Sequence, residues 1–223
     1  MNYKGCVVVQ GPINIEALPK IKECFRGYQL IHSCWEGNDT SLFDETDIVL
    51  INKIPNDSGP GNYLFQRENT LKGLDKAEEL GWARALKWRS DMWCTNVDGL
   101  WDMFESDKLN LYYWVEHISG YITDFFMEGD ISDIKTLFSS EVPNYRYKHT
   151  EFILTLMLFT TDLYRKTVFM GSKLNPNCDV YWAKRKCWFS SNQREEWYLD
   201  YFPYEGTDWL LIKEKDRITK FDN

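Results

Sequence analysis

The sequence predicts an α/β protein in which a mostly parallel β-sheet is flanked by helices within a single domain. Three observations support this fold class. The β-branched run Cys6–Gln10 has the composition of a buried parallel strand. Such runs alternate along the chain with segments of helical spacing, which is the pattern of βαβ units. Hydrophobic residues make up 43% of the 223 residues, enough to form a sizeable core.

The first half of the chain repeats the order of strand, loop and helix. The first strand ends at Gly11-Pro12, a pair typical of a loop. A loop rich in Asn, Gly and Pro precedes the long second helix, and Gly81 is well suited to end that helix. The expected elements are a helix over Ile15–Phe25, strands over Tyr28–Trp35 and Asp47–Asn52, and a helix over Asn62–Leu80.

The second half follows a weaker pattern. Asp130 is a candidate N-cap, with Asp133 in a capping-box position. The expected elements are strands over Leu109–Val115 and Gly120–Phe126, helices over Asp130–Phe138 and Thr150–Tyr164, and strands over Val180–Trp188 and Asp208–Ile212.

The stretch Ala85–Trp93 begins as a strand and ends in charged residues. Leu86 and Trp88 face one side of the sheet, while Lys87 and Arg89 face the other. The strand then stops at Arg89-Ser90-Asp91. Ligands of open α/β sheets bind just beyond the carboxyl ends of the strands, so we expect a ligand at this tip. Polar or aromatic residues end the other strands in the same way: Gln10, Trp35 and Asn52.

The composition and the absence of several motifs argue against a number of functional classes. A net charge of −8 argues against binding to nucleic acid or to anionic membranes. No apolar run reaches the roughly 20 residues that span a bilayer. No secretory signal is present and no Cys-x-x-Cys pair occurs, so we expect reduced thiols and a cytoplasmic protein. The P-loop, the Gly-x-Gly-x-x-Gly fingerprint, the Gly-x-Ser-x-Gly elbow and zinc-like histidine spacing are all absent.

Two groups of residues are candidates for chemistry. Asp91 offers the hard oxygen ligand that suits Mg²⁺ or Mn²⁺, and Lys87 and Arg89 flank it. Its alternative interpretation is a surface ion pair with Arg89. Asp124 is a candidate general base, because its apolar neighbours would raise its pKa. Glu151, in the first turn of a helix, is the rival base, and its alternative role is to stabilise that helix.

Five segments occur in one order that resembles a known family. They are Val8-Val9-Gln10-Gly11-Pro12-Ile13, Ile31-His32-Ser33-Cys34-Trp35-Glu36-Gly37, Asn62 through Gln66-Arg67 with Gly73-Leu74, Lys87-Trp88-Arg89-Ser90-Asp91, and Thr123-Asp124-Phe125-Phe126 with Gly129. Together they resemble the WavE-like lipopolysaccharide-synthesis glycosyltransferases, and most closely the compact GT-A domain of large chlorella-virus glycosyltransferases. The resemblance covers roughly Val7 to Leu158. It implies a nucleotide-binding half up to about residue 95 and a half that binds the glycan acceptor over about residues 96–223.

The resemblance implies a GT-A fold, a UDP-sugar donor, a glycan acceptor and transfer assisted by Mn²⁺ or Mg²⁺, on the cytoplasmic side or in the host cytoplasm of a virus. It favours an L-rhamnosyl or hexosyl donor such as UDP-L-rhamnose or UDP-glucose, transferred with inversion. Asp91 would bind the metal, with His149 as a second candidate ligand. The residues expected around the donor are Gln10, Gly11, Pro12, Trp35, Asn62, Arg67, Lys87, Arg89 and Ser90.

One departure from the wider GT-A class concerns its Asp-x-Asp metal motif, whose first position here is Arg89. Two other functions stay open. A sugar-nucleotidyltransferase would want a basic, glycine-rich loop after the first strand, whereas the first cation after Gly11 is Lys20. A non-catalytic glycan-binding module would use the Trp- and Tyr-rich last third of the chain to stack on sugars, and would bind glycan without a nucleotide.

Overall fold

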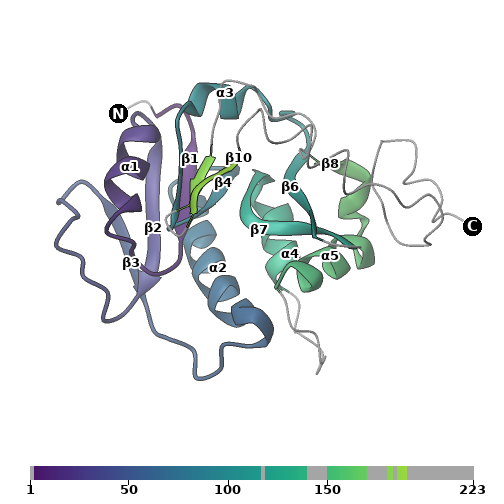
Figure 1. Ribbon diagram of the computed structural model, residues 1–223, viewed down its shortest axis with the longest axis horizontal. Coiled ribbons are helices and arrows are strands. Elements are labelled where there is room, and N and C mark those ends of the chain that lie inside the picture. The colour runs from purple at the N-terminus through teal and green to yellow at the C-terminus, as the bar shows by residue number, and fades with distance from the viewer. Residues whose placement is uncertain (1–2, 117–118, 140–149, 170–179, 183–184, 190–223) are drawn as a thin grey trace, which may run out of the picture.

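The computed structural model describes residues 3–116, 119–139, 150–169, 180–182 and 185–189. Their main feature is a seven-stranded sheet of order β3-β2-β1-β4-β7-β6-β8 (Figure 1). The pairs β1–β2, β2–β3 and β1–β4 are all parallel. These four strands span Cys6–Gln10 (β1), Gln29–Trp35 (β2), Ile48–Asn52 (β3) and Arg84–Arg89 (β4).

The other half of the sheet contains one reversed strand. β7 (Ser119–Asp130) runs antiparallel to both β4 and β6 (Leu109–Glu116). The short β8 (Thr167–Phe169) pairs parallel with β6. β6 and β8 therefore run in the same direction as the first four strands. The expected α/β fold with a mostly parallel sheet is confirmed.

Helices cover both faces of the sheet and enclose two cores. α1 (Ala17–Cys24) and the short α3 (Val97–Trp101) pack with Val7, Val9 and Trp88 on one face. On the other face the helices pack with Val8, Ile31 and Ala85. Those helices are α2 (Tyr63–Glu79), α4 (Ile131–Ser139) and α5 (Thr150–Thr160). Burial of apolar area on two faces is what a parallel sheet needs for stability.

β4 is the clearest case of sequence setting structure. Its side chains alternate as expected, with Ala85 in one core and Leu86 and Trp88 in the other. The Trp88 ring is fully buried, with its centroid 5.2 Å from those of Phe25 and Phe126. Both arrangements lie within the range of favourable aromatic pairs. The strand that ends at Arg89 is therefore held rigidly from one side.

Several elements differ from the expectation. The stretch Val180–Trp188 is not one strand but two, β9 (Val180–Trp182) and β10 (Arg185–Phe189), which pair antiparallel. β9 also pairs with β5 (Met92–Cys94), which forms a second, three-stranded sheet. The last expected helix ends at Thr160 and is followed by a 3-10 turn, Asp162–Lys166 (η2). The expected strand over Asp208–Ile212 lies outside the described residues.

Two acidic residues near α4 take part in ion pairs. The Asp130 carboxylate lies 2.9 Å from the Arg84 guanidinium, and the Asp133 carboxylate lies 2.6 Å from the Lys166 ammonium.

A second 3-10 turn, Pro60–Asn62 (η1), precedes α2. Within the described part of the chain, we find no helix whose length and apolar character would allow it to cross a bilayer.

Candidate functional site

The strand order places a topological switch point between β1 and β4. From β1 the chain moves outward through β2 to β3, and α2 then returns it to β4 on the other side of β1. Here α1, which follows β1, and β5 and α3, which follow β4, pack on the same face of the sheet. Ligands of open α/β sheets bind beyond the carboxyl ends of the strands at a topological switch point. The switch point thus coincides with the Arg89-Ser90-Asp91 tip expected to bind a ligand.

Hydrogen bonds join the loops after β1 and β4. The Ser90 backbone N–H donates to the Gln10 carbonyl at 2.9 Å, and the Ser90 hydroxyl donates to the Pro12 carbonyl at 2.7 Å. Gly11 has a φ of +121°, and a Cβ built on it would lie 2.6 Å from the Ser90 Oγ. Only glycine fits this backbone and this close approach. The structure therefore brings together the predicted donor-site residues of both loops.

Arg89 is the centre of a charged cluster on the face of the sheet covered by α2. Its Nε and one terminal nitrogen donate to the two carboxylate oxygens of Asp91, at 2.9 and 2.8 Å. Its other terminal nitrogen donates to the Asp124 carboxylate, at 3.1 and 3.3 Å. The Asp124 side chain is 1% exposed, against 17% for Asp91 and 21% for Arg89. One guanidinium thus bridges two carboxylates.

Lys87 lies beneath this cluster and is fully buried. Its ammonium donates to the backbone carbonyl of Asp124. Burial lowers the pKa of Lys87 to about 8, with the negative charge of Asp124 opposing that shift and the positive charge of Arg89 adding to it. For Arg89, burial also disfavours the charge, but Asp124 and Asp91 outweigh it and raise the pKa above its ordinary value.

The structure brings the two candidate aspartates, Asp91 and Asp124, to the same cation. They lie side by side on the Arg89 guanidinium, because β7 runs antiparallel beside β4 and delivers Asp124 to the same edge. Glu151, in the first turn of α5, also acts on Lys87 electrostatically and so lies near the cluster. Its side chain is half-buried.

The remaining predicted donor residues lie around the start of α2. Asn62 precedes α2 with a left-handed φ of 65°. Trp35 is buried, 5.6 Å from the ring of Phe65 in α2. Arg67 donates from Nε to the Phe138 carbonyl at 2.7 Å, near the end of α4. Their proposed contacts with a nucleotide stay predictions.

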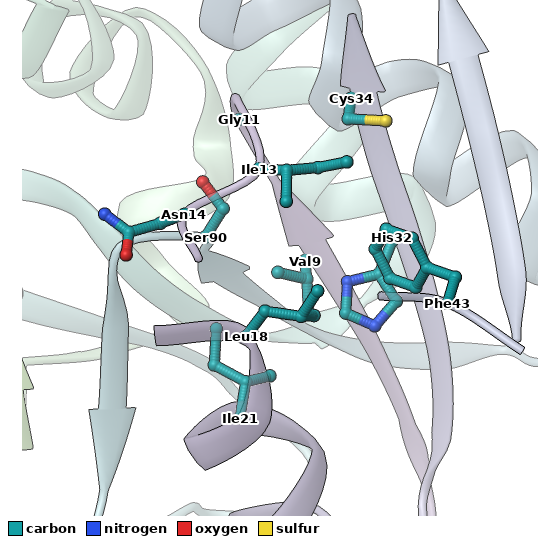
Figure 2. Close-up of a pocket in the computed structure, with 10 residues that line it drawn as sticks. All are labelled: Val9, Gly11, Ile13, Asn14, Leu18, Ile21, His32, Cys34, Phe43 and Ser90. Atoms are coloured by element: carbon teal, nitrogen blue, oxygen red, sulfur yellow. The ribbon is translucent and has the colours of Figure 1, made fainter. Parts of the chain in front are cut away.

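A pocket opens on the opposite face of the sheet, between β1, β2 and α1 (Figure 2). Gly11, Asn14 and Ser90 are among its lining residues. Apolar side chains and His32 line the rest: Val9, Ile13, Leu18, Ile21, Cys34 and Phe43. The pocket thus shares Gly11 and Ser90 with the switch point.

His32 is the residue in this pocket that sequence reasoning missed. It is 3% exposed, and its Nε2 has no hydrogen-bond partner among the described residues. Its ring centroid lies 4.7 Å from that of Phe43. Burial lowers the pKa of His32 to about 4, an effect that Asp47 opposes and Lys22 reinforces. The available signal was its alternation with Leu30 and Cys34, which places all three on one face of β2.

The described residues do not fit the divalent metal that the sequence resemblance implies. Among the described residues, no group of three or more histidine, cysteine, aspartate or glutamate side chains could hold a metal ion. Both oxygens of Asp91 already accept hydrogen bonds from Arg89. The other predicted ligand, His149, lies outside the described residues.

Comparison with known proteins gives no family for the chain. No family model matches it, and no curated protein matches it either. Among solved structures, it is similar to a glycosyltransferase involved in the glycosylation of the major capsid of PBCV-1. The two share 11% identity with a TM-score of 0.44, over 76% of this chain and 83% of the other. At that level the likeness assigns no activity by itself.

Proposed function

We propose that this protein is a glycosyltransferase that takes a sugar from a nucleotide-sugar donor and passes it to a glycan acceptor. The observation that carries the proposal is the switch point, where the loop after β1 and the Arg89 cluster after β4 meet. The carboxyl edge at a switch point is where α/β sheets bind nucleotides. The sequence resemblance favours UDP as the nucleotide and L-rhamnose or glucose as the sugar.

The reaction needs positive charge on one side and a base on the other. The bond between the anomeric carbon and the diphosphate breaks, and the diphosphate leaves with the electron pair. The acceptor oxygen forms the new bond, while its proton passes to a carboxylate. Lys87 and Arg89 would offset the two aspartates, so that a diphosphate meets less repulsion at this edge. With inversion, the acceptor attacks from the side opposite the diphosphate.

Glu151 is the better candidate for the base. The Asp124 carboxylate is almost fully buried and already accepts hydrogen bonds from Arg89, so an acceptor hydroxyl has poor access to it. Glu151 is more exposed and lies near the same cluster. We therefore assign proton abstraction to Glu151 and the positioning of Arg89 to Asp124.

Base assignment is tested with two amide variants in a transfer assay. Glu151→Gln should lower kcat by roughly 10²- to 10⁴-fold, the usual share of general-base catalysis, with little change in donor affinity. Asp124→Asn should weaken donor binding and lower stability, because it disturbs Arg89. The reverse pattern would return the base role to Asp124.

Nucleotide binding is tested by thermal and urea unfolding with UDP, GDP and ADP. UDP at about a hundredfold excess over its Kd should stabilise the protein by about 2.7 kcal/mol. Gly11→Ala should lose this stabilisation because the new Cβ meets Ser90. Gly81→Ala is the matched control, since Gly81 also has a positive φ of 87° but no atom within 4 Å of its Cβ position. Equal stabilisation by all three nucleotides would contradict a uridine site, and glycan binding without any nucleotide effect would favour a non-catalytic module.

A further inference from the structure

We infer that the Arg89 guanidinium occupies the place of a catalytic divalent cation at the tip of β4, so that this protein works without a bound metal. The inference rests on the proposed function for its catalytic meaning, because it names the cation that serves the donor site. Its structural part rests on the contacts of Arg89 alone.

The contacts of Arg89 are those expected of a bridging cation. It joins two carboxylates that come from different strands, Asp91 after β4 and Asp124 in β7. Asp91 is held through both of its oxygens, and Asp124 through both of its own. A divalent ion at this position would need those same oxygens as ligands.

Charge and burial oppose exchange of the guanidinium for a metal ion. The Asp124 side chain is 1% exposed, so its negative charge needs a permanent partner to remain stable. An arginine stays charged at every pH at which the protein is folded, and its planar fork matches two carboxylates well. A metal ion entering beside it would meet the repulsion of a positive charge that is itself largely buried.

β4 contains a second arginine with similar contacts, Arg84, which serves as a comparison for Arg89. Arg84 bridges Glu128 and Asp130 at the amino end of the strand, with contacts of 2.9 Å to each. Because that end lies away from the switch point, we assign Arg84 a structural role, as a clamp between β4 and β7. Arg89 uses the same chemistry at the carboxyl end, where the loops after β1 and β4 meet.

The inference is tested directly by titrating the protein with Mn²⁺. Binding is measured by calorimetry and by the loss of the EPR signal of the free ion. The wild-type protein should show no saturable Mn²⁺ site that depends on Asp91. Arg89→Ala should gain one, with an affinity about tenfold or more above the weak, non-saturable Mn²⁺ binding of the wild type, because two adjacent carboxylates lose their cation. Arg89→Lys should gain none, since it keeps a positive charge at the tip.

The double variant Arg89→Ala/Asp91→Asn identifies the gained site and should lose it. A wild-type Mn²⁺ site that Asp91→Asn abolishes would overturn the inference, and so would a folded Arg89→Ala that gains no site. If Arg89→Ala does not fold, comparing Mn²⁺ binding by the wild type and by Asp91→Asn still tests the inference, because a site lost in Asp91→Asn would overturn it. UDP-dependent stabilisation is measured both in EDTA and with added Mn²⁺ to keep the two ideas separate. Its absence under both conditions contradicts the proposed function, whereas stabilisation that requires Mn²⁺ contradicts the inference about Arg89.

Discussion

The guanidinium of Arg89 and the imidazole of His32 show two ways in which a buried polar side chain is accommodated. Arg89 is compensated by two carboxylates within 3.3 Å. The Nε2 of His32 has no hydrogen-bond partner in the described part of the chain, and burial there favours the neutral form of the ring. Burial disfavours the charge of both side chains, but two carboxylates outweigh this effect at Arg89, whereas burial prevails at His32.

The lowered pKa of His32 predicts a stability that depends on pH. The unfolded chain binds a proton near the ordinary value of 6.5, whereas the folded protein does so only near pH 4. Stability is therefore complete above pH 6.5 and falls as the pH drops toward 4. At pH 5 the loss should be about 2 kcal/mol.

The measurement is the difference between the free energies of urea unfolding at pH 7 and pH 5, for the wild type and for His32→Leu. The direct packing effect of the substitution cancels in this difference. The variant should lose less stability between the two pH values than the wild type does. Equal losses would show that His32 is readily protonated in the folded state.

At the scale of elements, β4 and β7 are joined by more than backbone hydrogen bonds. They pair antiparallel from Arg84–Asp130 to Trp88–Phe126, and an arginine of β4 bridges two acidic residues at each end of that pairing. At the amino end, Asn110 of β6 adds a hydrogen bond to Glu128 at 2.7 Å. These contacts help to fix the register of β7, the reversed strand of the seven-stranded sheet as described.

Arg84→Ala should destabilise the protein by about 2 kcal/mol without changing transfer. Glu128 is 6% exposed and would lose its charge partner, but Arg84 is 28% exposed, which reduces the cost from the roughly 3–5 kcal/mol of a fully buried pair. Urea unfolding measures the change. Lys76→Ala is the control, because its 2.8 Å pair with Glu79 is largely exposed and should contribute well under about 1 kcal/mol. Similar losses in both variants would show that the Arg84 clamp is unimportant.

At the scale of the whole molecule, burial falls from the centre of the sheet to its edge. Every residue of β1 is buried, and β1 is paired on both sides by β2 and β4. β3 pairs only with β2 in the described sheet, and its Ile51 is 59% exposed. The loops that form the proposed donor site therefore project from the most protected strands.

Native-state hydrogen exchange should follow this gradient. Amides of Val7–Val9 should exchange only on global unfolding, whereas those of Ile48–Asn52 should exchange through local opening of the edge. Mass spectrometry of peptides from the two strands measures the rates, and added UDP should further slow exchange at the loops after β1 and β4. Equal protection of β1 and β3 would contradict this picture.

Local patterns account for much of the fold. The β-branched run of β1, the alternation in β4 and the helical spacing of α2 each predicted an element that the structure contains. Strand ends with polar residues also predicted that Gln10 and Ser90 would meet at one edge of the sheet, because parallel strands bring their carboxyl ends together. The β9–β10 hairpin was missed, because a short apolar run does not reveal where it turns.

What the sequence by itself determined was therefore the class of fold, the central strands and the edge that carries Gln10, Gly11, Ser90 and Arg89. Only the tertiary structure decided that Asp91 and Asp124 share one guanidinium. Asp124 lies 35 residues from Arg89, and its position depends on β7 running antiparallel to β4, a pairing that no local pattern specifies. His32 became notable for a similar reason, since its burial depends on α1 and on Phe43, which the chain brings over β2 only when it folds.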